Sequence, residues 1–174
     1  MTIKNNAIKL GMIVFLSVLI IGALLIVGCG GVKEQETSSA TKHYAENGIS
    51  FDYPETWGPG NSSDPNAIAA LISPVGGFFI VVLKETMPSG YTLKTFNDET
   101  VMSMNPTQMI SGSFPTVAGV SACDSVFKTN DSQMRIVILE KNGNVYVIIC
   151  SAPAAAFDNA QTSFNMVINS FSVQ

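Results

Sequence analysis

The sequence predicts an α+β domain in which a largely antiparallel β-sheet is flanked by helices on both faces. Residues 120–151 hold three strand-like runs joined by short turns, the pattern of an antiparallel meander. Residues 78–83 (FFIVVL) are apolar throughout, as in a strand covered on both faces. Two further segments carry apolar residues at helical spacing. We therefore expect an α/β/α sandwich, preceded by an N-terminal hydrophobic helix.

The N-terminal segment has the pattern of an export signal. Lys4 and Lys9 precede an uncharged apolar run at residues 10–27, and a positive flank before such a run is typical of secretory signals. Residues 26–29 (IVGC) match a lipobox, with an aliphatic residue three positions before the cysteine and a small residue just before it. Cys29 is therefore the predicted lipidation site, carrying an acyl lipid such as palmitate.

An uncleaved transmembrane helix is the alternative for this segment, because a run of about 20 apolar residues can span a bilayer. In both cases the lysines stay in the cytoplasm, so residues 30–174 face the extracytoplasmic side. One acyl chain binds a membrane only marginally, so stable anchoring requires a second chain or a retained helix. The expected location is the cell membrane, with the domain lipid-anchored outside it.

The chain divides into a signal or membrane segment at 1–28, a tether at 29–43 and a folded domain at 44–174. The tether is polar and lacks aromatic residues, as flexible linkers do. The chain carries 9 basic and 13 acidic residues, and the loss of two lysines with the signal leaves 7 against 13, a net charge of −6. A domain without a basic patch cannot neutralise phosphates, so nucleic acid is excluded as a partner.

The first half of the domain is predicted to be mainly strands. Residues 49–53 alternate apolar and polar side chains, which indicates a half-buried strand. Asn-Gly at 47–48 favours a tight turn from a short strand at 44–46. The next two strands are expected at 67–72 and 78–83, where Gly and Pro residues between them favour a turn.

A helix is predicted in the middle of the chain, followed by a weak strand at 107–111. Its apolar residues recur at helical spacing from Leu93 to Met104. Thr92 is expected to cap its N-terminus, and Pro106 to end it. Asp98 should face water.

The meander consists of predicted strands at 120–129, 133–141 and 144–151. Asn142-Gly143 between the last two is a strong signal for a type I′ hairpin turn. A C-terminal helix of about four turns follows. Its apolar face is formed by Phe157, Ala160, Phe164, Val167, Ile168 and Phe171.

The register of the meander argues against a disulfide bond between Cys123 and Cys150. The turn positions place Cys123 opposite Ile138, and Cys150 opposite Arg135. Because side chains alternate between faces, the two cysteines should lie on different faces with a strand between them. A disulfide requires Cα atoms within about 7 Å, so both are expected to be free, buried thiols.

Three segments resemble the PsbP-like domains. Residues 48–57 (GISFDYPETW) resemble the opening of these domains, residues 142–148 (NGNVYVI) resemble a hairpin strand, and residues 157–171 resemble the closing helix. The family is similar to the extrinsic PsbP subunit of photosystem II and to a Ran-binding relative. The resemblance implies an antiparallel sheet between helices and an accessory or binding role. It implies no catalytic, cofactor or metal residue in this chain.

The residues give little support for catalysis. The only histidine, His43, lies at the tether edge, whereas a Ser-His-Asp site needs a base packed beside its nucleophile. Met102, Met104 and Met109 could supply thioether ligands for Cu(I), but apolar packing at the end of the helix is the expectation. No cofactor is predicted.

Three carboxylates flank Trp57 and could hold a hard cation such as Ca²⁺, although a solvated rim is expected instead: Asp52, Glu55 and Asp64. Trp57 itself is expected to anchor the core. Asn61 and Asn130 fit the glycosylation sequon, and the sequence leaves open whether either is modified.

The favoured hypothesis is a membrane-anchored, non-enzymatic accessory or binding module with an unidentified protein partner. An extracytoplasmic hydrolase using Asp52 or Asp124 is the first alternative. A ligand- or metal-binding lipoprotein is the second.

Overall fold

The computed structural model describes residues 40–174 of the chain. The predicted signal, the lipobox with Cys29 and most of the tether lie outside these described residues, so their assignments remain predictions. Within the described part, no helix has the length and apolar character needed to cross a membrane.

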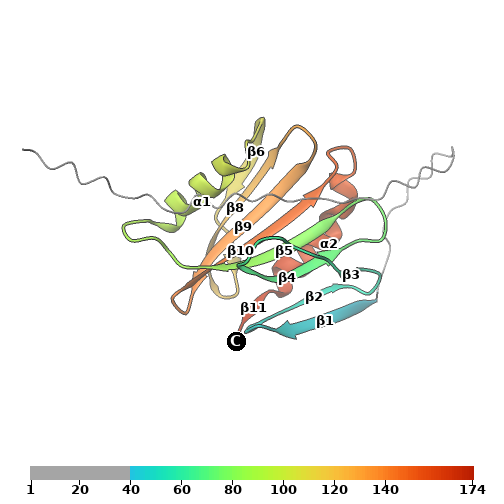
Figure 1. The fold of residues 1–174 in the computed structure, drawn as a ribbon, viewed down its shortest axis with the longest axis horizontal. Coiled ribbons are helices and arrows are strands. Elements are labelled where there is room, and N and C mark those ends of the chain that lie inside the picture. The colour runs from blue at the N-terminus through green and yellow to red at the C-terminus, as the bar shows by residue number, and fades with distance from the viewer. Residues whose placement is uncertain (1–39) are drawn as a thin grey trace, which may run out of the picture.

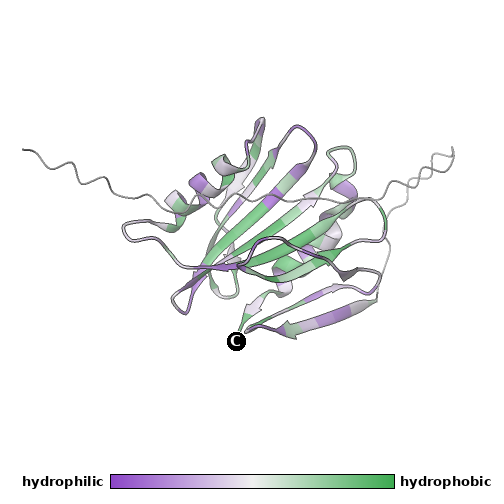
Figure 2. Ribbon diagram, in the orientation of Figure 1, coloured by the Kyte–Doolittle hydropathy of each residue, from purple (hydrophilic) through white to green (hydrophobic). Residues whose placement is uncertain are grey.

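The main sheet is antiparallel and its strands follow the order β3-β4-β5-β10-β9-β8-β6, with β7 paired to β8 (Figure 1). The most apolar strands, β5, β10 and β9, lie at its centre, as the green colouring of Figure 2 shows. The bounds are β3 (Gly58–Pro59), β4 (Ala67–Ile72), β5 (Phe79–Glu85), β6 (Gln108–Ser113), β7 (Thr116–Val117), β8 (Val120–Lys128), β9 (Gln133–Lys141) and β10 (Asn144–Ala152).

A second, three-stranded sheet has the order β1-β2-β11. Its strands are β1 (Thr41–Glu46), β2 (Ile49–Pro54) and β11 (Ser172–Val173). The strand β1 begins three residues before Tyr44, the predicted start of the domain, because Thr41 to His43 pair with the end of β2. These residues are exposed and polar, so no hydrophobic pattern marks them.

Helices cover both faces of the main sheet, as predicted. Helix α1 (Leu93–Ser103) packs on β8 and β9, and α2 (Phe157–Ser170) packs on β10 and β2. The Thr92 hydroxyl accepts a hydrogen bond from the Thr95 amide at 3.1 Å, which confirms the predicted N-cap. The sandwich therefore has α1 on one side of the main sheet, and α2 with the small sheet on the other.

Two hydrophobic cores fill the spaces between these layers. Alternation along β9 sends Ile136 and Ile138 to the α1 side, and Val137 and Leu139 to the α2 side. All four side chains are fully buried. The strands of the sheet centre are therefore apolar on both faces, which explains why their sequences show no alternation.

The meander has the predicted register. Cys123 pairs with Ile138, and Cys150 pairs with Arg135. Both cysteines are free and buried, on opposite faces of the sheet. The turn before β10 has Asn142 at φ 54° and Gly143 at φ 74°, the left-handed conformation of a type I′ turn.

The two-residue strands β3, β7 and β11 were not predicted. Elements of this length contain too few residues to show a period. The strand β6 was predicted as a weak strand ending at residue 111, and it continues to Ser113.

Candidate functional site

A surface groove of about 370 Å³ lies between helix α1 and the edge strand β6. We call it the α1–β6 groove. Helix α1 supplies one wall, β6 and the residues after it supply the other, and β8 forms the floor. Its lining residues are Lys94, Asn97, Asp98, Val101, Met102, Met109, Gly112, Ser113, Phe114, Cys123, Asp124 and Ser125.

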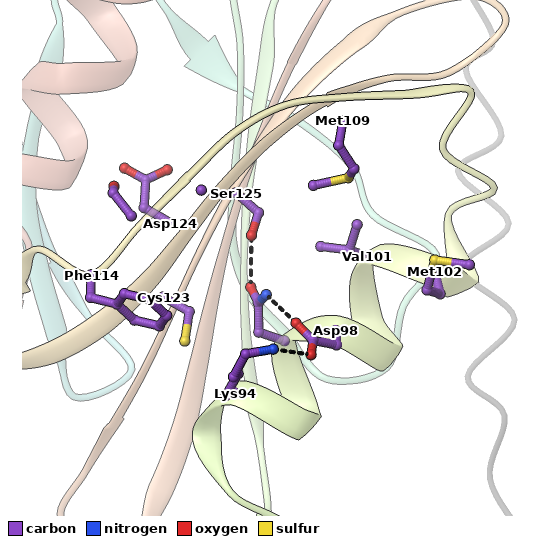
Figure 3. A pocket seen from close by; sticks show the side chains of 12 residues that line it. Lys94, Asp98, Val101, Met102, Met109, Phe114, Cys123, Asp124 and Ser125 are labelled. Carbon is purple, nitrogen blue, oxygen red and sulfur yellow. Dashed lines mark hydrogen bonds and ion pairs between the residues drawn. The ribbon is translucent and has the colours of Figure 1, made fainter.

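A short chain of hydrogen bonds fixes α1 to the floor of the groove (Figure 3). The hydroxyl of Ser125 donates to the amide oxygen of Asn97 at 3.2 Å, and both residues are buried. The Asn97 amide nitrogen donates to Asp98 at 3.4 Å, and Asp98 also pairs with Lys94. The bond between Ser125 and Asn97 satisfies buried polar groups that would otherwise destabilise the helix–sheet contact.

Asn97 was not singled out from the sequence, although a signal was present. It lies four residues after Leu93 and four before Val101, so it falls on the apolar stripe of α1. A polar residue on such a stripe needs a hydrogen-bond partner inside the protein.

The upper walls of the groove are apolar and exposed. Phe114 is 71% exposed, Met102 67% and Met109 52%. The expectation that the methionines pack at the end of α1 is therefore wrong for Met102 and Met109. Met102 is not among the buried residues of α1, which are Asn97 and Val101. Met109 lies on β6, whereas α1 packs on β8 and β9. Only Met104 packs against the α1-side core. The three thioethers do not gather at one point, since Met104 does not line the groove.

The groove has an open position at Gly112. A Cβ atom placed on this glycine would meet nothing within 4 Å, and its backbone conformation needs no glycine. The neighbouring thiol of Cys123 is buried, and burial together with the charge of Asp98 raises its pKa, against a smaller opposing effect of Lys94. A thiol with a raised pKa stays protonated at neutral pH and is a poor nucleophile.

The outer side of β6 is an open sheet edge. The strand pairs with β8 on one side and ends the order of the main sheet within residues 40–174. A bulge at Ile110 interrupts the pairing with β8, and this side chain is 45% exposed. No residue of β6 is charged. Charges, prolines and bulges are the usual devices that protect an edge strand from further pairing. The strand β6 has the bulge at Ile110 but neither a charge nor a proline.

The carboxylate of Asp124 is held by Arg135 on the other face of the sheet. It accepts hydrogen bonds from Arg135 Nε at 3.0 Å and Nη2 at 2.7 Å, and Arg135 Nη1 also donates to Asn165 on α2 at 2.6 Å. Burial disfavours the charged guanidinium, but the hydrogen bonds and charge of Asp124 outweigh this and raise the pKa of Arg135. A carboxylate engaged in this way braces α2 against the sheet and is not available as a general base.

The other predicted candidates lie apart from the groove. His43 contacts Asp52 at 2.7 Å across β1 and β2, on the surface. Asp64 accepts a hydrogen bond from the Asn66 amide in its own loop. Within residues 40–174, no three His, Cys, Asp or Glu side chains come close enough to share a metal ion. Asp52, Glu55 and Asp64 therefore do not form one cluster.

Trp57 is only 1% exposed and packs edge-on against Phe164 of α2, which confirms its predicted role as a core anchor. Asn61 and Asn130 are exposed in loops, and their glycosylation stays a prediction.

Within residues 40–174, the fold and the groove define a small α+β domain in which the edge strand β6 is open and uncharged. No family model matches the chain, and neither does any curated protein. Solved structures do match. Cyanobacterial PsbP (CyanoP) from Synechocystis has a TM-score of 0.54 at 17% identity, over 86% of this chain and 99% of that one. The domain therefore has the PsbP-like fold.

Two further structures share this fold. LpqN of Mycobacterium tuberculosis, described as involved in cell envelope biogenesis, has a TM-score of 0.53 at 16% identity, over 78% of this chain and 90% of that one. The Ran-binding protein Mog1p of Saccharomyces cerevisiae has a TM-score of 0.57 at 10% identity, over 77% of this chain and 95% of that one. At these identities the likeness extends to the fold alone.

Proposed function

We propose that this chain is a membrane-anchored extracytoplasmic lipoprotein whose PsbP-like domain is a non-enzymatic accessory module that binds another protein through β6. The observation that carries the proposal is the open, uncharged edge of β6 beside the exposed apolar walls of the α1–β6 groove. Backbone groups on such an edge can pair with an added strand, and apolar pockets beside the strand give specificity. The descriptions of LpqN and Mog1p, an envelope protein and a binding protein, support the same class of function.

The position of the anchor favours a protein partner over the lipid surface. The described chain begins at β1, which contacts β4 where the Tyr44 hydroxyl donates to the Ile68 carbonyl at 2.7 Å. The strand β6 lies five strand positions from β4 in the main sheet, or about 24 Å at the usual strand spacing. In Figure 1, β1 and β6 lie at opposite ends of the domain. A tether at β1 therefore leaves β6 pointing away from the anchor point.

The arrangement does not favour the hydrolase alternative. The Asp124 carboxylate is occupied by Arg135, and Asp52 lies on the outer sheet with His43 as its partner. Neither carboxylate is directed into the α1–β6 groove. Of the two nucleophilic side chains that line it, Cys123 has a thiol with a raised pKa and Ser125 donates its hydroxyl to Asn97.

The proposal is tested by affinity capture from gently solubilised membranes, using the full-length chain with a tag after Gln174. Ile110→Lys adds a charge to the β6 edge. Ile72→Lys is the matched control, because Ile72 is an equally exposed isoleucine (46%) on β4, near the other end of the sheet. We expect wild type and Ile72→Lys to recover the same partner, and Ile110→Lys to lose it at least tenfold. Equal recovery by all three would contradict the role of β6.

The anchor is tested separately by Cys29→Ser. We expect this variant to lose its lipid and to leave the membrane fraction. Unchanged processing and membrane retention would contradict the lipid tether and favour an uncleaved helix.

A further inference from the structure

We propose that the occupant of the β6 edge is the β6 strand of a second copy of this chain, paired antiparallel about a two-fold axis. The main sheets of the two copies then form one continuous sheet. This inference rests on the proposed function, since it names the partner for the same edge.

The charge distribution favours a second copy. Residues 40–174 carry 6 basic and 11 acidic residues, a net charge of −5, yet residues 100–123 contain no charged side chain. This stretch includes β6, β7 and the exposed Phe114. Two acidic domains repel each other over most of their surfaces, and this neutral edge lets them meet without like charges in contact. A basic partner would gain more from the acidic surfaces elsewhere.

The charges on the α1 wall of the groove neutralise each other. Lys94 and Asp98 form an ion pair one helical turn apart on α1. Neither charge needs a partner from outside, so this part of the groove does not call for a charged partner.

A two-fold pair of β6 strands is self-complementary. In a two-fold interface each copy presents the same residues to the other, so the strand must tolerate its own sequence as its neighbour. The sequence of β6 (QMISGS) meets this condition because it contains no charge and no proline. Exposed backbone groups then form ladder hydrogen bonds on both copies.

The added strand also covers apolar side chains that are exposed in the single domain. Cross-strand neighbours on one face lie about 5 Å apart, so the second β6 lies beside Met109 and Phe114. The open position above Gly112 leaves room for a side chain from the partner strand. The interface is small, since a standard stable interface covers about 800 Å² on each partner. Anchoring both copies in one membrane raises their effective concentration, which favours pairing there.

The test is disulfide cross-linking of the full-length chain in native membranes. Single cysteines replace the six exposed residues of β6, 108–113, in turn. The two-fold axis of such a pair passes beside one residue of the strand, and that residue lies next to its own copy. With a mild oxidant, we expect at least one variant to give a reducible dimer in at least fivefold excess over the unsubstituted chain and over the control Ile72→Cys.

The same cross-link is then measured with a second substitution. Ile110→Lys should reduce the dimer at least fivefold, and Ile72→Lys should leave it unchanged. If no β6 cysteine exceeds the controls, or if Ile110→Lys has no effect on the dimer, the second-copy inference is wrong. If the cross-link is absent while partner capture still depends on Ile110, the inference fails and the proposed function stands. If both are absent, both fail.

Discussion

At the scale of single residues, two ion pairs of different burial illustrate which charges matter for stability. Asp124 and Arg135 are 9% and 16% exposed, and their carboxylate and guanidinium groups are joined by hydrogen bonds on two nitrogens. Lys94 and Asp98 are solvent-exposed on α1. A mostly buried charge that loses its partner is strongly destabilising, whereas exposed pairs contribute little.

Asp124→Ala should therefore lower the free energy of unfolding by about 3 kcal/mol, because it leaves the Arg135 guanidinium without its carboxylate. Lys94→Ala, the control, should cost far less, because an exposed ion pair contributes little to stability. Urea unfolding of the two variants measures the difference. The double variant Asp124→Leu with Arg135→Met should recover part of the loss, and equal costs for the two single changes would disprove the bracing role.

The buried thiols give a prediction for alkaline pH. Burial raises the pKa of Cys150 to about 12, with Arg135 opposing and Asp124 adding to the shift. An unfolded thiol ionises near pH 9, so the folded state holds one more proton between pH 9 and about 12. The contribution of the protonated Cys150 thiol to the free energy of unfolding is therefore fully present below pH 9. It is lost as the pH rises through this window, by up to about 1.4 kcal/mol per pH unit.

Cys150→Ala removes this proton and should show a shallower loss of stability between about pH 9 and pH 11 than wild type. The comparison uses the slope of unfolding free energy against pH, so a constant cost of the substitution does not affect it. Parallel slopes would contradict the burial effect. Cys123→Ala should change the slope in the same direction, because the pKa of the Cys123 thiol is also raised.

At the scale of elements, the glycines of β6 and of the β9–β10 turn have different roles. Gly143 has φ 74°, a conformation that side chains rarely adopt, while nothing lies within 4 Å of the position that a Cβ atom would take there. Gly112 has equal space and an ordinary backbone conformation. Any cost of a Cβ atom at residue 143 is therefore conformational, and residue 112 tests the same addition without that cost.

Gly143→Ala should destabilise the domain by about 1–2 kcal/mol, the cost of a left-handed conformation for a residue with a Cβ atom. Gly112→Ala should be neutral or stabilise it by up to about 1 kcal/mol, by reducing the entropy of the unfolded chain. Chemical denaturation of both variants checks this. A loss at residue 112 as large as that at 143 would show that the groove is not open at this position.

The elements also show what the sequence could predict. The meander was predicted with its register because Asn142-Gly143 fixes the turn, and one turn sets every pair along two strands. Helix α1 was predicted from its cap and its apolar spacing. The start of β1 and the short strands β3, β7 and β11 were not, because their pairing depends on distant partners rather than on a local pattern.

The candidate site was less predictable than the fold. Met102 and Met109 were expected to pack, since spacing along the chain does not reveal which side of α1 faces the sheet, or that β6 lies beyond the residues that α1 covers. The open edge of β6 follows from strand order, which no local pattern contains. Asn97 could have been noticed as a polar residue on the apolar stripe of α1, but its partner Ser125 is identified only once the helix and strand are placed together.

At the scale of the whole molecule, the end of the domain where the described chain begins lies far from the proposed binding edge. The described chain enters at β1, and the open edge β6 lies at the far side of the main sheet (Figure 1). The α2-side core packs α2 against the main sheet, and the hydrogen bond from Arg135 on β9 to Asn165 on α2 also joins the two. A tethered domain built in this way can present β6 to a neighbour while its other end stays near the anchor.

The most direct measurement of the central claim is hydrogen exchange of the β6 amides in the full-length, membrane-assembled chain. If β6 is a binding edge, the amides of residues 108–113 that face away from β8 should exchange at least tenfold more slowly in wild type and in Ile72→Lys than in Ile110→Lys. Equal, rapid exchange at these amides in all three chains would contradict the account.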